Sequence, residues 1–291
     1  MFDPFRPRRS VLYMPGSNAR ALEKAKGLAA DALILDLEDA VAATEKASAR
    51  DLVVDAVREG GYGKREICVR INGLDTDHGM EDLRAACEAA PDAILVPKAQ
   101  SATMIEEIDA LMEDYGAPAS TQIWAMMETP LGVLHAEKVA MASTRLSVFV
   151  MGTNDLAEDL RARRTKDRLA LVPHLTHCLL VARSYGMVAI DGVYNAFRDS
   201  EAFEERCIQS RNLGFDGKTL IHPSQIDVCN RVFAPDERTI EHAKAQIKAF
   251  EEAQQNGEGI AVLDGRIVEN LHAEAARTLL VRHNAIRSMG H

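Results

Sequence analysis

The 291-residue sequence lacks the long hydrophobic stretch that a membrane protein needs. No apolar run reaches the ~18 residues required to cross a bilayer, and the N-terminal segment MFDPFRPRRS has no apolar core of the kind found in secretion signals. Cysteine is scarce: there are five, an odd number, and none forms a C-x-x-C pair. These absences predict a soluble, cytoplasmic protein without a disulfide framework and without a membrane partner.

Signatures of several common enzyme classes are missing as well. The chain has no G-x-G-x-x-G dinucleotide fingerprint, no G-x-S-x-G esterase elbow and no H-E-x-x-H zinc motif. Basic residues are outnumbered, with 34 Lys and Arg against 44 Asp and Glu, so the net charge is −10. This balance argues against nucleic acid as a partner, but a local basic pocket could still hold a small anion.

What the sequence does contain is a repeated alternation of strand-like and helix-like segments. Eight short apolar runs are expected strands: Ser10–Met14, Ala32–Leu37, Ile67–Ile71, Ala93–Pro97, Gln122–Met127, Leu146–Met151, Met187–Ile190 and Lys218–Ile221. Segments of helical period lie between them, such as Asn18–Ala29, Glu45–Arg58, Ala102–Asp114 and Asp199–Asn212. Eight such units predict an α/β fold, a closed (β/α)8 TIM barrel, with an open doubly wound sheet as the alternative.

The pattern changes after His222. Asp236–Gln255 is predicted to be one charged helix, a glycine-containing hinge follows, and Ala261–Leu263 is a short apolar piece before a last helix from about Glu269 to Arg287. We therefore expect a barrel domain over residues 1–230 and a C-terminal helical extension over residues 231–291. The extension could pack on its own barrel or on a neighbouring subunit.

Polar side chains follow seven consecutive predicted strands, at the end of a TIM barrel where active sites are built. They are Asp36, Glu38 and Asp39 after the second strand, Arg70 and Asn72 after the third, Lys98 after the fourth, Glu128 and Thr129 after the fifth, Thr153, Asn154 and Asp155 after the sixth, Asp191 after the seventh and His222 after the eighth. So dense a set of acids around one arginine predicts an active site at this rim.

Glu128 and Asp155 are the candidate metal ligands. They follow adjacent strands, so their carboxylates can converge, and two carboxylates without a nearby His or Cys suit a hard cation such as Mg2+. The alternative is that both residues only cap the helices that follow them.

Arg70 is the candidate ligand for a substrate oxygen, since its guanidinium is expected over the barrel mouth. An ion pair with Asp36 or Glu38 is the alternative, and both roles are compatible because a paired arginine is also an oriented one. The crowding of Asp36, Glu38 and Asp39 is expected to raise at least one carboxyl pKa.

Six motifs carry a family resemblance: R-S-V-L-Y-M-P-G from Arg9, D-L-E-D-A-V from Asp36, R-I-N from Arg70, M-E-T-P from Met127, G-T-N-D-L from Gly152 and L-G-F-D-G-K-T-L-I-H-P from Leu213. Together, in this order, they resemble the aldolase/citrate lyase family, and more narrowly the citrate lyase beta-subunit-like proteins, which include malyl-CoA lyases and (3S)-malyl-CoA thioesterases. Asp39 stands where relatives that act on free pyruvate carry a histidine, which disfavours a pyruvate aldolase.

The resemblance implies a set of site residues. Mg2+, with Mn2+ as an alternative, would be held by Glu128 and Asp155, and Arg70 would bind the 2-oxo or thioester oxygen. Asp36 and Glu38 are predicted to be catalytic residues together with Arg70. The substrate and its coenzyme A would be held by Arg9, Lys46, Arg70, Gly152, Thr153 and Asn154.

The resemblance also implies a homotrimer or hexamer in which the extension covers a neighbour's site. Many relatives have D-G-x-x-I-D in this tail, and its last Asp enters the partner's site as an acid or base. Here Glu269 occupies that position, so the carboxylate is kept but moves by about one methylene.

The predicted function is an Mg2+-dependent lyase that cleaves malyl-CoA-type esters to glyoxylate, or a 2-oxo acid, and acyl-CoA through an enolate. The alternative is a (3S)-malyl-CoA thioesterase that hydrolyses the same substrate to malate and CoA. A second alternative is a citrate lyase beta subunit that acts on an acyl-carrier partner.

Overall fold

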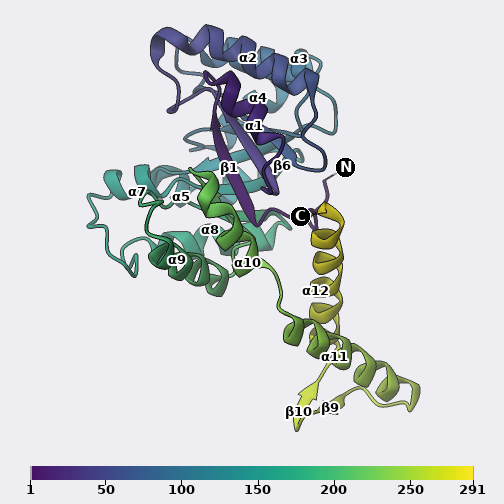
Figure 1. Ribbon diagram of the computed structural model, residues 1–291. Helices are drawn as coiled ribbons and strands as arrows, with labels where there is room; N and C mark the ends of the chain where they lie inside the picture. Colours follow the sequence, from purple (N-terminus) through teal and green to yellow (C-terminus); the bar gives the residue numbers. More distant parts are fainter. Residues whose placement is uncertain (1, 291) are drawn as a thin grey trace. The chain divides into compact units, whose positions relative to one another are not determined.

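The chain forms two compact units in the computed structural model, which describes residues 2–290 (Figure 1). The first unit comprises residues 2–4 and 8–233, and the second comprises residues 5–7 and 234–290. The longer segment of the second unit thus begins directly after the last barrel helix.

The first unit is built on a closed barrel of eight parallel strands, which confirms the predicted fold. The strands are β1 (Ser10–Pro15), β2 (Ala32–Asp36), β3 (Glu66–Arg70), β4 (Ala93–Val96), β5 (Gln122–Met127), β6 (Leu146–Met151), β7 (Val188–Asp191) and β8 (Gly217–Leu220). Each strand lies within one residue of its predicted bounds. The barrel closes where Val11 of β1 pairs with Thr219 of β8.

Alternate residues of these strands fill the barrel interior. Among the described residues, the interior cluster contains Val11, Ala32, Ile34, Cys68, Ala93, Leu95, Trp124, Met126, Val148, Val150, Val188 and Ile190. Trp124 is completely buried among them, as expected for a core residue. The intervening strand residues face outward and pack against the helices in a second, larger cluster. This alternation of period two decides which side chains reach the barrel mouth.

Helices cover the outside of the barrel (Figure 1). They are α1 (Ala19–Ala25), α2 (Lys46–Glu59), α3 (Gly79–Ala89), α4 (Ala102–Asp114), α5 (Pro130–Leu134), α6 (Ala136–Met141), α7 (Thr153–Asp159), α8 (Val172–Ser184), α9 (Ser200–Leu213) and α10 (Ile226–Phe233), with 3-10 turns at Ala43–Glu45 and Pro223–Gln225. Local sequence explains their ends: Ser101 accepts the Met104 N–H to start α4, and Gly214, with φ +108°, ends α9.

The second unit packs two helices around a hairpin. It contains α11 (Glu237–Gln255), β9 (Ala261–Leu263), β10 (Arg266–Val268) and α12 (Asn270–Met289). Its core is formed by Phe250, Ala253, Ala261, Val268 and Ala273. The sequence pattern did not indicate β10, a three-residue strand that depends on the turn at Asp264 and Gly265, both with positive φ.

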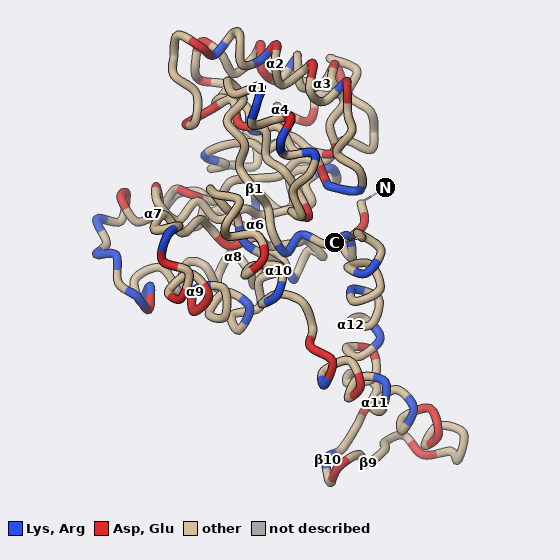
Figure 2. The backbone as a smooth tube through the Cα atoms, viewed as in Figure 1, with Lys and Arg blue, Asp and Glu red and all other residues tan. Residues whose placement is uncertain are grey.

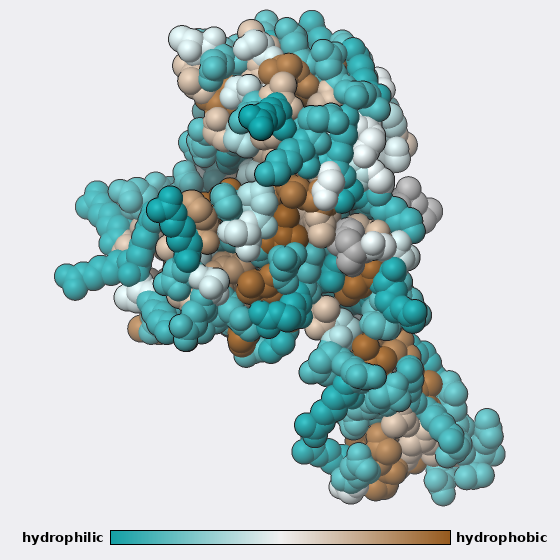
Figure 3. Space-filling view, in the orientation of Figure 1, coloured by the Kyte–Doolittle hydropathy of each residue, from teal (hydrophilic) through white to brown (hydrophobic). Residues whose placement is uncertain are grey.

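Large apolar side chains remain exposed on the second unit. Val262, Ile267 and Leu271 are each more than half exposed, and they surround the turn and the start of α12. Figure 3 shows hydrophobic surface on this unit beside the hairpin. Within residues 2–290, no helix has the length and apolar character needed to cross a membrane.

Candidate active site

Three charged side chains continue the interior-facing series at the C-terminal end of the barrel. Asp36, Arg70 and Glu128 each come two residues after a side chain of the interior cluster, on β2, on β3 and just after β5. All three are buried, with exposed fractions of 1%, 6% and 3%. Strand periodicity therefore brings an arginine and two carboxylates together in the barrel mouth.

The acidic residues at the end of β2 hold the Arg70 guanidinium in place. Its Nε and Nη2 donate to the two carboxylate oxygens of Asp36, each at 2.6 Å. Its Nη1 lies 2.8 Å from Glu38 Oε2 and 3.4 Å from Asp39 Oδ2. Three of these contacts are hydrogen bonds, and the contact with Glu38 is an ion pair. Because Nη2 has two N–H groups and donates only one of them to Asp36, its other N–H is left for an oxygen of a ligand. The ion pair foreseen as an alternative is present, and it orients Arg70 without exhausting its donors.

Glu38 lies beside this pair and is mostly buried. Burial raises the pKa of Glu38 to about 7, the nearby charges of Asp39 and Asp36 add to the increase, and Arg70 opposes it. A carboxyl group with this pKa can gain or lose a proton near neutral pH, as a general acid or base must. The predicted catalytic role of Glu38 remains a prediction, now with a protonation equilibrium that suits it.

Glu128 is oriented by the backbone of the preceding strand–helix loop. Its Oε1 accepts a hydrogen bond of 2.8 Å from the Lys98 N–H, and Lys98 adopts a left-handed conformation with φ +47°. None of the residues described donates to the other oxygen, Oε2. Burial raises the pKa of Glu128 to about 8, and the negative charges of Glu38 and Asp155 contribute to the increase.

Asp155 lies in the first turn of α7 and is exposed, with its carboxylate near enough to Glu128 to raise that group's pKa. The helix-capping alternative for these two acids is wrong. Thr129 Oγ1 caps α5 by accepting the Gly132 N–H, and Gly152, not Asp155, precedes the first residue of α7. The two carboxylates are therefore not engaged in capping.

Gly152 gives Glu128 the space that it occupies. A Cβ at position 152 would lie 2.3 Å from Glu128 Cβ and 2.5 Å from its Oε2. Such distances are far below van der Waals contact, so a residue with a side chain at this position would displace the Glu128 carboxylate. This explains why the position carries no side chain, and the predicted contact of Gly152 with the substrate remains a prediction.

These residues fit a divalent cation. The donors are carboxylate oxygens without imidazole or thiolate, which is the ligand chemistry of Mg2+. A buried carboxylate with a raised pKa and one oxygen free of hydrogen bonds gains most from a cation beside it. Within residues 2–290 no group of three or more His, Cys, Asp or Glu side chains forms a complete protein-only metal site, so waters and substrate oxygens would have to complete the coordination.

Lys46 lies at the same end of the barrel but serves the loop after β2. Its Nζ donates to Leu37 O at 2.8 Å, Glu38 O at 2.6 Å and Asn72 Oδ1 at 2.8 Å. An ammonium has three donors, and all are used. Lys46 therefore positions the acidic loop, and its predicted contact with CoA would require one of these bonds to break.

Thr153 and Asn154 are found at the start of α7, next to Asp155. The amides of Asn154 and Asn195 bond to each other at 3.0 and 3.4 Å, and so link α7 to the segment after β7. Thr153 is buried against Gly192, where a Cβ would lie 2.4 Å from Thr153 Oγ1. Both residues line a pocket beside the candidate metal ligands.

The structure places Arg9, which was predicted to help to hold CoA, away from the barrel mouth. Arg9 precedes β1 and therefore lies at the N-terminal end of the barrel, opposite the mouth. Its guanidinium forms a two-point pair with Asp31, with both distances 2.8 Å, and the side chain is buried. Arg8 makes an equivalent pair with Glu66. These arginines close the bottom of the barrel.

Glu269 belongs to the second unit, immediately before α12. It is exposed, and its side chain and that of His272 form a reciprocal capping box at the start of this helix. Its predicted role as an acid or base in a partner's site remains a prediction.

Tyr13 belongs to the mouth but was not singled out from the sequence. Its ring lies 4.9 Å from the Arg70 guanidinium carbon, and burial raises the pKa of its hydroxyl, so the group stays protonated. The signal that could have found it is the alternation of β1, in which Val11 faces the interior and Tyr13 follows two residues later.

Comparisons with known proteins agree with this geometry. Residues 9–223 match the model of the family described as HpcH/HpaI aldolase/citrate lyase. The chain belongs to this family. It is 53% identical to a (3S)-malyl-CoA thioesterase of Cereibacter sphaeroides over 96% of each chain, and 36% identical to the citrate lyase subunit beta of Leuconostoc mesenteroides over 98% of this chain and 97% of that one.

Solved structures that resemble this chain share its fold. The CitE protein of Mycobacterium tuberculosis, in complex with magnesium, acetoacetate and coenzyme A, has a TM-score of 0.77 and 28% identity over 94% of this chain and 97% of its own. RipC of Yersinia pestis has a TM-score of 0.69 and 28% identity over 82% of this chain and all of its own. The family prediction from the motifs is confirmed.

Proposed function

We propose that this protein is an Mg2+-dependent thioesterase that hydrolyses (3S)-malyl-CoA to malate and CoA. The observation that carries the proposal is the 53% identity, over nearly the full length of both chains, with a protein named for this activity. The lyase preferred from the motifs becomes the alternative, because the relatives whose names indicate a lyase match at 36% identity.

The barrel mouth supports an enzyme that acts on an acidic ester. Glu128 and Asp155 would hold Mg2+, which supplies positive charge for the carboxylate and hydroxyl oxygens of a malyl group. Arg70, fixed by Asp36, has one N–H on Nη2 available for the thioester carbonyl oxygen, where negative charge develops as water attacks. Glu38 is suited to take the proton of that water.

In hydrolysis, a new C–O bond forms between water and the thioester carbon, and the C–S bond breaks to release the thiol of CoA. In the lyase reaction, the C–C bond next to the hydroxyl breaks instead, which gives glyoxylate and acetyl-CoA. Both reactions place negative charge on the same carbonyl oxygen, and for this reason the Arg70 geometry serves either one. Only the products therefore distinguish hydrolysis from the lyase reaction.

The test is product analysis with (3S)-malyl-CoA and Mg2+, using a thiol reagent for CoA and chromatography for the acids. We expect malate and free CoA in equal amounts, and Arg70→Lys to reduce turnover strongly, since lysine lacks the fork that Asp36 holds. Glyoxylate and acetyl-CoA as the main products would establish the lyase instead. If purified protein turns over no CoA ester with Mg2+ present, a subunit that needs an acyl-carrier partner is indicated.

We also propose that Glu269 acts in the site of a neighbouring subunit of a homotrimer or hexamer. The exposed apolar side chains around the hairpin, Val262, Ile267 and Leu271, support a covered position for this segment in an assembly. The test mixes two inactive variants, Glu128→Gln and Glu269→Gln, by co-expression. If each active site takes the two residues from different chains, about a quarter of the sites in the mixed oligomers contain both native glutamates, and activity returns. If both residues come from one chain, the co-expressed protein stays as inactive as each variant alone.

A further inference from the structure

The connection between α7 and α8 is strongly basic. Its residues 161–168 read RARRTKDR and contain Arg161, Arg163, Arg164, Lys166 and Arg168. Figure 2 shows this concentration of positive charge as a blue stretch that follows α7. On a chain whose net charge is −10, such a cluster calls for a physical reason.

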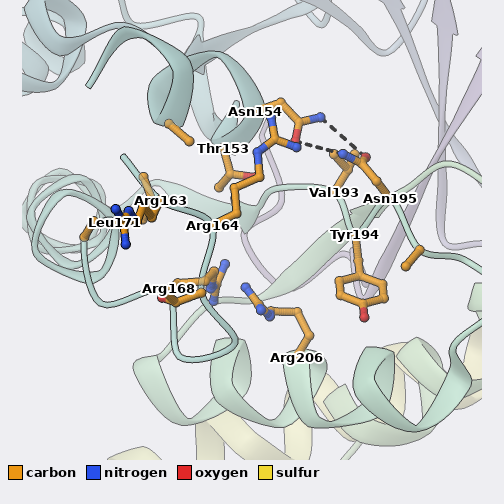
Figure 4. A pocket seen from close by; sticks show the side chains of 14 residues that line it. Thr153, Asn154, Arg163, Arg164, Arg168, Leu171, Val193, Tyr194, Asn195 and Arg206 are labelled. Atoms are coloured by element: carbon orange, nitrogen blue, oxygen red, sulfur yellow. Dashed lines mark hydrogen bonds between the residues drawn. The ribbon is translucent and has the colours of Figure 1, made fainter. Parts of the chain in front are cut away.

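The loop forms one wall of a pocket in the first unit. The opposite wall comes from the segment after β7 and from α9, and the cavity volume is about 190 Å³. Arg163, Arg164, Arg168 and Arg206 all line it, together with Tyr194. Figure 4 shows the guanidinium ends of Arg168 and Arg206 turned toward each other across this space.

Two of the four arginines are locked in position. Arg168 is buried, its Nη1 donates to both carboxylate oxygens of Asp191 at 2.8 Å, and its Nε donates to Gln209 at 2.9 Å. Its backbone is left-handed, with φ +55°. Arg206 donates to Lys166 O at 2.9 Å, and its guanidinium carbon lies 5.9 Å from the centre of the Tyr194 ring. The pocket thus holds two guanidinium groups in fixed positions. Asp191 neutralises Arg168, whereas Arg206 pairs with no carboxylate among the described residues.

The other two arginines of the pocket are available to bind a ligand. Arg163 and Arg164 are exposed and make no hydrogen bond or ion pair with any residue that the structure describes. The nearby acids are already engaged. Asp191 is shared between Arg168 and the buried Lys218, and Glu205 pairs with Lys166. Asp167 accepts from Thr165 and from the Leu169 N–H. Positive charge therefore exceeds negative charge around the pocket.

We infer that this pocket binds a small, multiply charged oxyanion, a phosphate or polycarboxylate group, through Arg164, Arg168 and Arg206. Guanidinium groups converging from two elements match the geometry of such oxygens. The pocket shares Thr153 and Asn154 with the rim beside Asp155, so its ligand sits next to the candidate active site. The inference does not depend on which reaction occurs there. The oxyanion could belong to the CoA portion of a substrate or to a separate small molecule.

The experiment is calorimetric titration of the full-length protein with inorganic pyrophosphate in a buffer without Mg2+, at two salt concentrations. We expect binding that weakens with salt, and a loss of affinity of about tenfold in Arg164→Gln and in Arg206→Gln, because each removes a charge-assisted contact. Arg161→Gln is the matched control, since it removes the same charge from the same loop without touching the pocket. We expect it to change the affinity less than about twofold.

Titration with CoA and with dephospho-CoA, which lacks the 3′-phosphate, distinguishes the two sources of the oxyanion. If a phosphate of CoA enters the pocket, pyrophosphate competes with CoA and Arg164→Gln weakens CoA binding. The variant then leaves dephospho-CoA unaffected if that group is the 3′-phosphate, and weakens it as well if the group is the diphosphate. If the oxyanion is a separate molecule, pyrophosphate and CoA bind at the same time and the variant leaves CoA unaffected. The absence of pyrophosphate binding to the unmodified protein at millimolar concentration, or an equal loss in Arg161→Gln, would overturn the inference.

Discussion

Replacing Glu128 by Gln should remove both Mg2+ binding and its pH dependence. The substitution keeps the size of the side chain and its hydrogen bond with the Lys98 N–H, but removes the negative charge. In the native protein, burial raises the pKa of Glu128 from 4.5 to about 8. Protons and Mg2+ therefore compete for this carboxylate across the neutral range.

The size of the effect follows from the pKa. If one proton must leave before Mg2+ binds, the apparent affinity falls about tenfold for each pH unit below 8 and levels off above it. Between pH 6 and pH 9 the dissociation constant should change by about a hundredfold. In Glu128→Gln the affinity should be low at every pH and should not vary with it.

The assay is calorimetric titration with Mg2+ at pH 6, 7, 8 and 9 at constant ionic strength. Glu158→Gln, an exposed glutamate on the same helix as Asp155, is the matched control and should behave as the unmodified protein does. An Mg2+ affinity that is constant from pH 6 to pH 9, or unchanged in Glu128→Gln, would refute the assignment of this residue.

Three further predictions concern stability and packing at the barrel mouth. Gly152→Ala should lower Mg2+ affinity at least tenfold and destabilise the fold by about 1–3 kcal/mol, because the added Cβ would lie 2.3 Å from Glu128 Cβ. An unchanged midpoint of urea unfolding together with an unchanged Mg2+ affinity would contradict this prediction. Asp36→Asn should cost about 3–5 kcal/mol, because it removes the buried carboxylate that holds Arg70 at two points, whereas Asp39→Asn, at an exposed contact of 3.4 Å, should cost less than about 1 kcal/mol. Equal losses in thermal unfolding would refute the distinction. Without metal, Glu128 should make the free energy of unfolding fall as pH rises from about 5 to 8, because the native residue binds a proton that the unfolded chain has already lost. Its contribution is at most about 1.4 kcal/mol per pH unit and adds to that of Glu38. Denaturant titrations should show a flatter slope in Glu128→Gln, and an equal slope in both proteins would exclude Glu128 as a source.

The barrel and part of its mouth could be predicted because both depend on local pattern. Each strand is an apolar run followed by polar residues, and in a parallel barrel all such strand ends meet at one rim. The alternation along β2 and β3 then aims Asp36 and Arg70 inward once the closed barrel is assumed. Glu128 follows from the same rule on β5.

The surroundings of Arg9 and Lys46 could not be deduced from the chain. The family resemblance implies that both help to hold CoA, but the two ends of a strand lie at opposite ends of the barrel. Arg9 precedes β1 at the N-terminal end of the barrel and pairs with Asp31. Lys46 donates two hydrogen bonds to the loop after β2 and one to Asn72 after β3. Proximity in sequence did not indicate to which end of the barrel a side chain belongs, nor which acceptors surround it.

The sequence by itself determined the barrel, the family and the residue types at the mouth, because periodicity and ordered motifs are properties of the chain. Only the tertiary structure decided how those residues are used. The raised pKa of Glu128 depends on burial and on the charges of Glu38 and Asp155, which come from three different parts of the chain. The arginine pocket likewise requires the loop after α7 and helix α9 to meet. Electrostatic free energies depend on distance and burial in space, and for this reason they emerge only when the chain is folded.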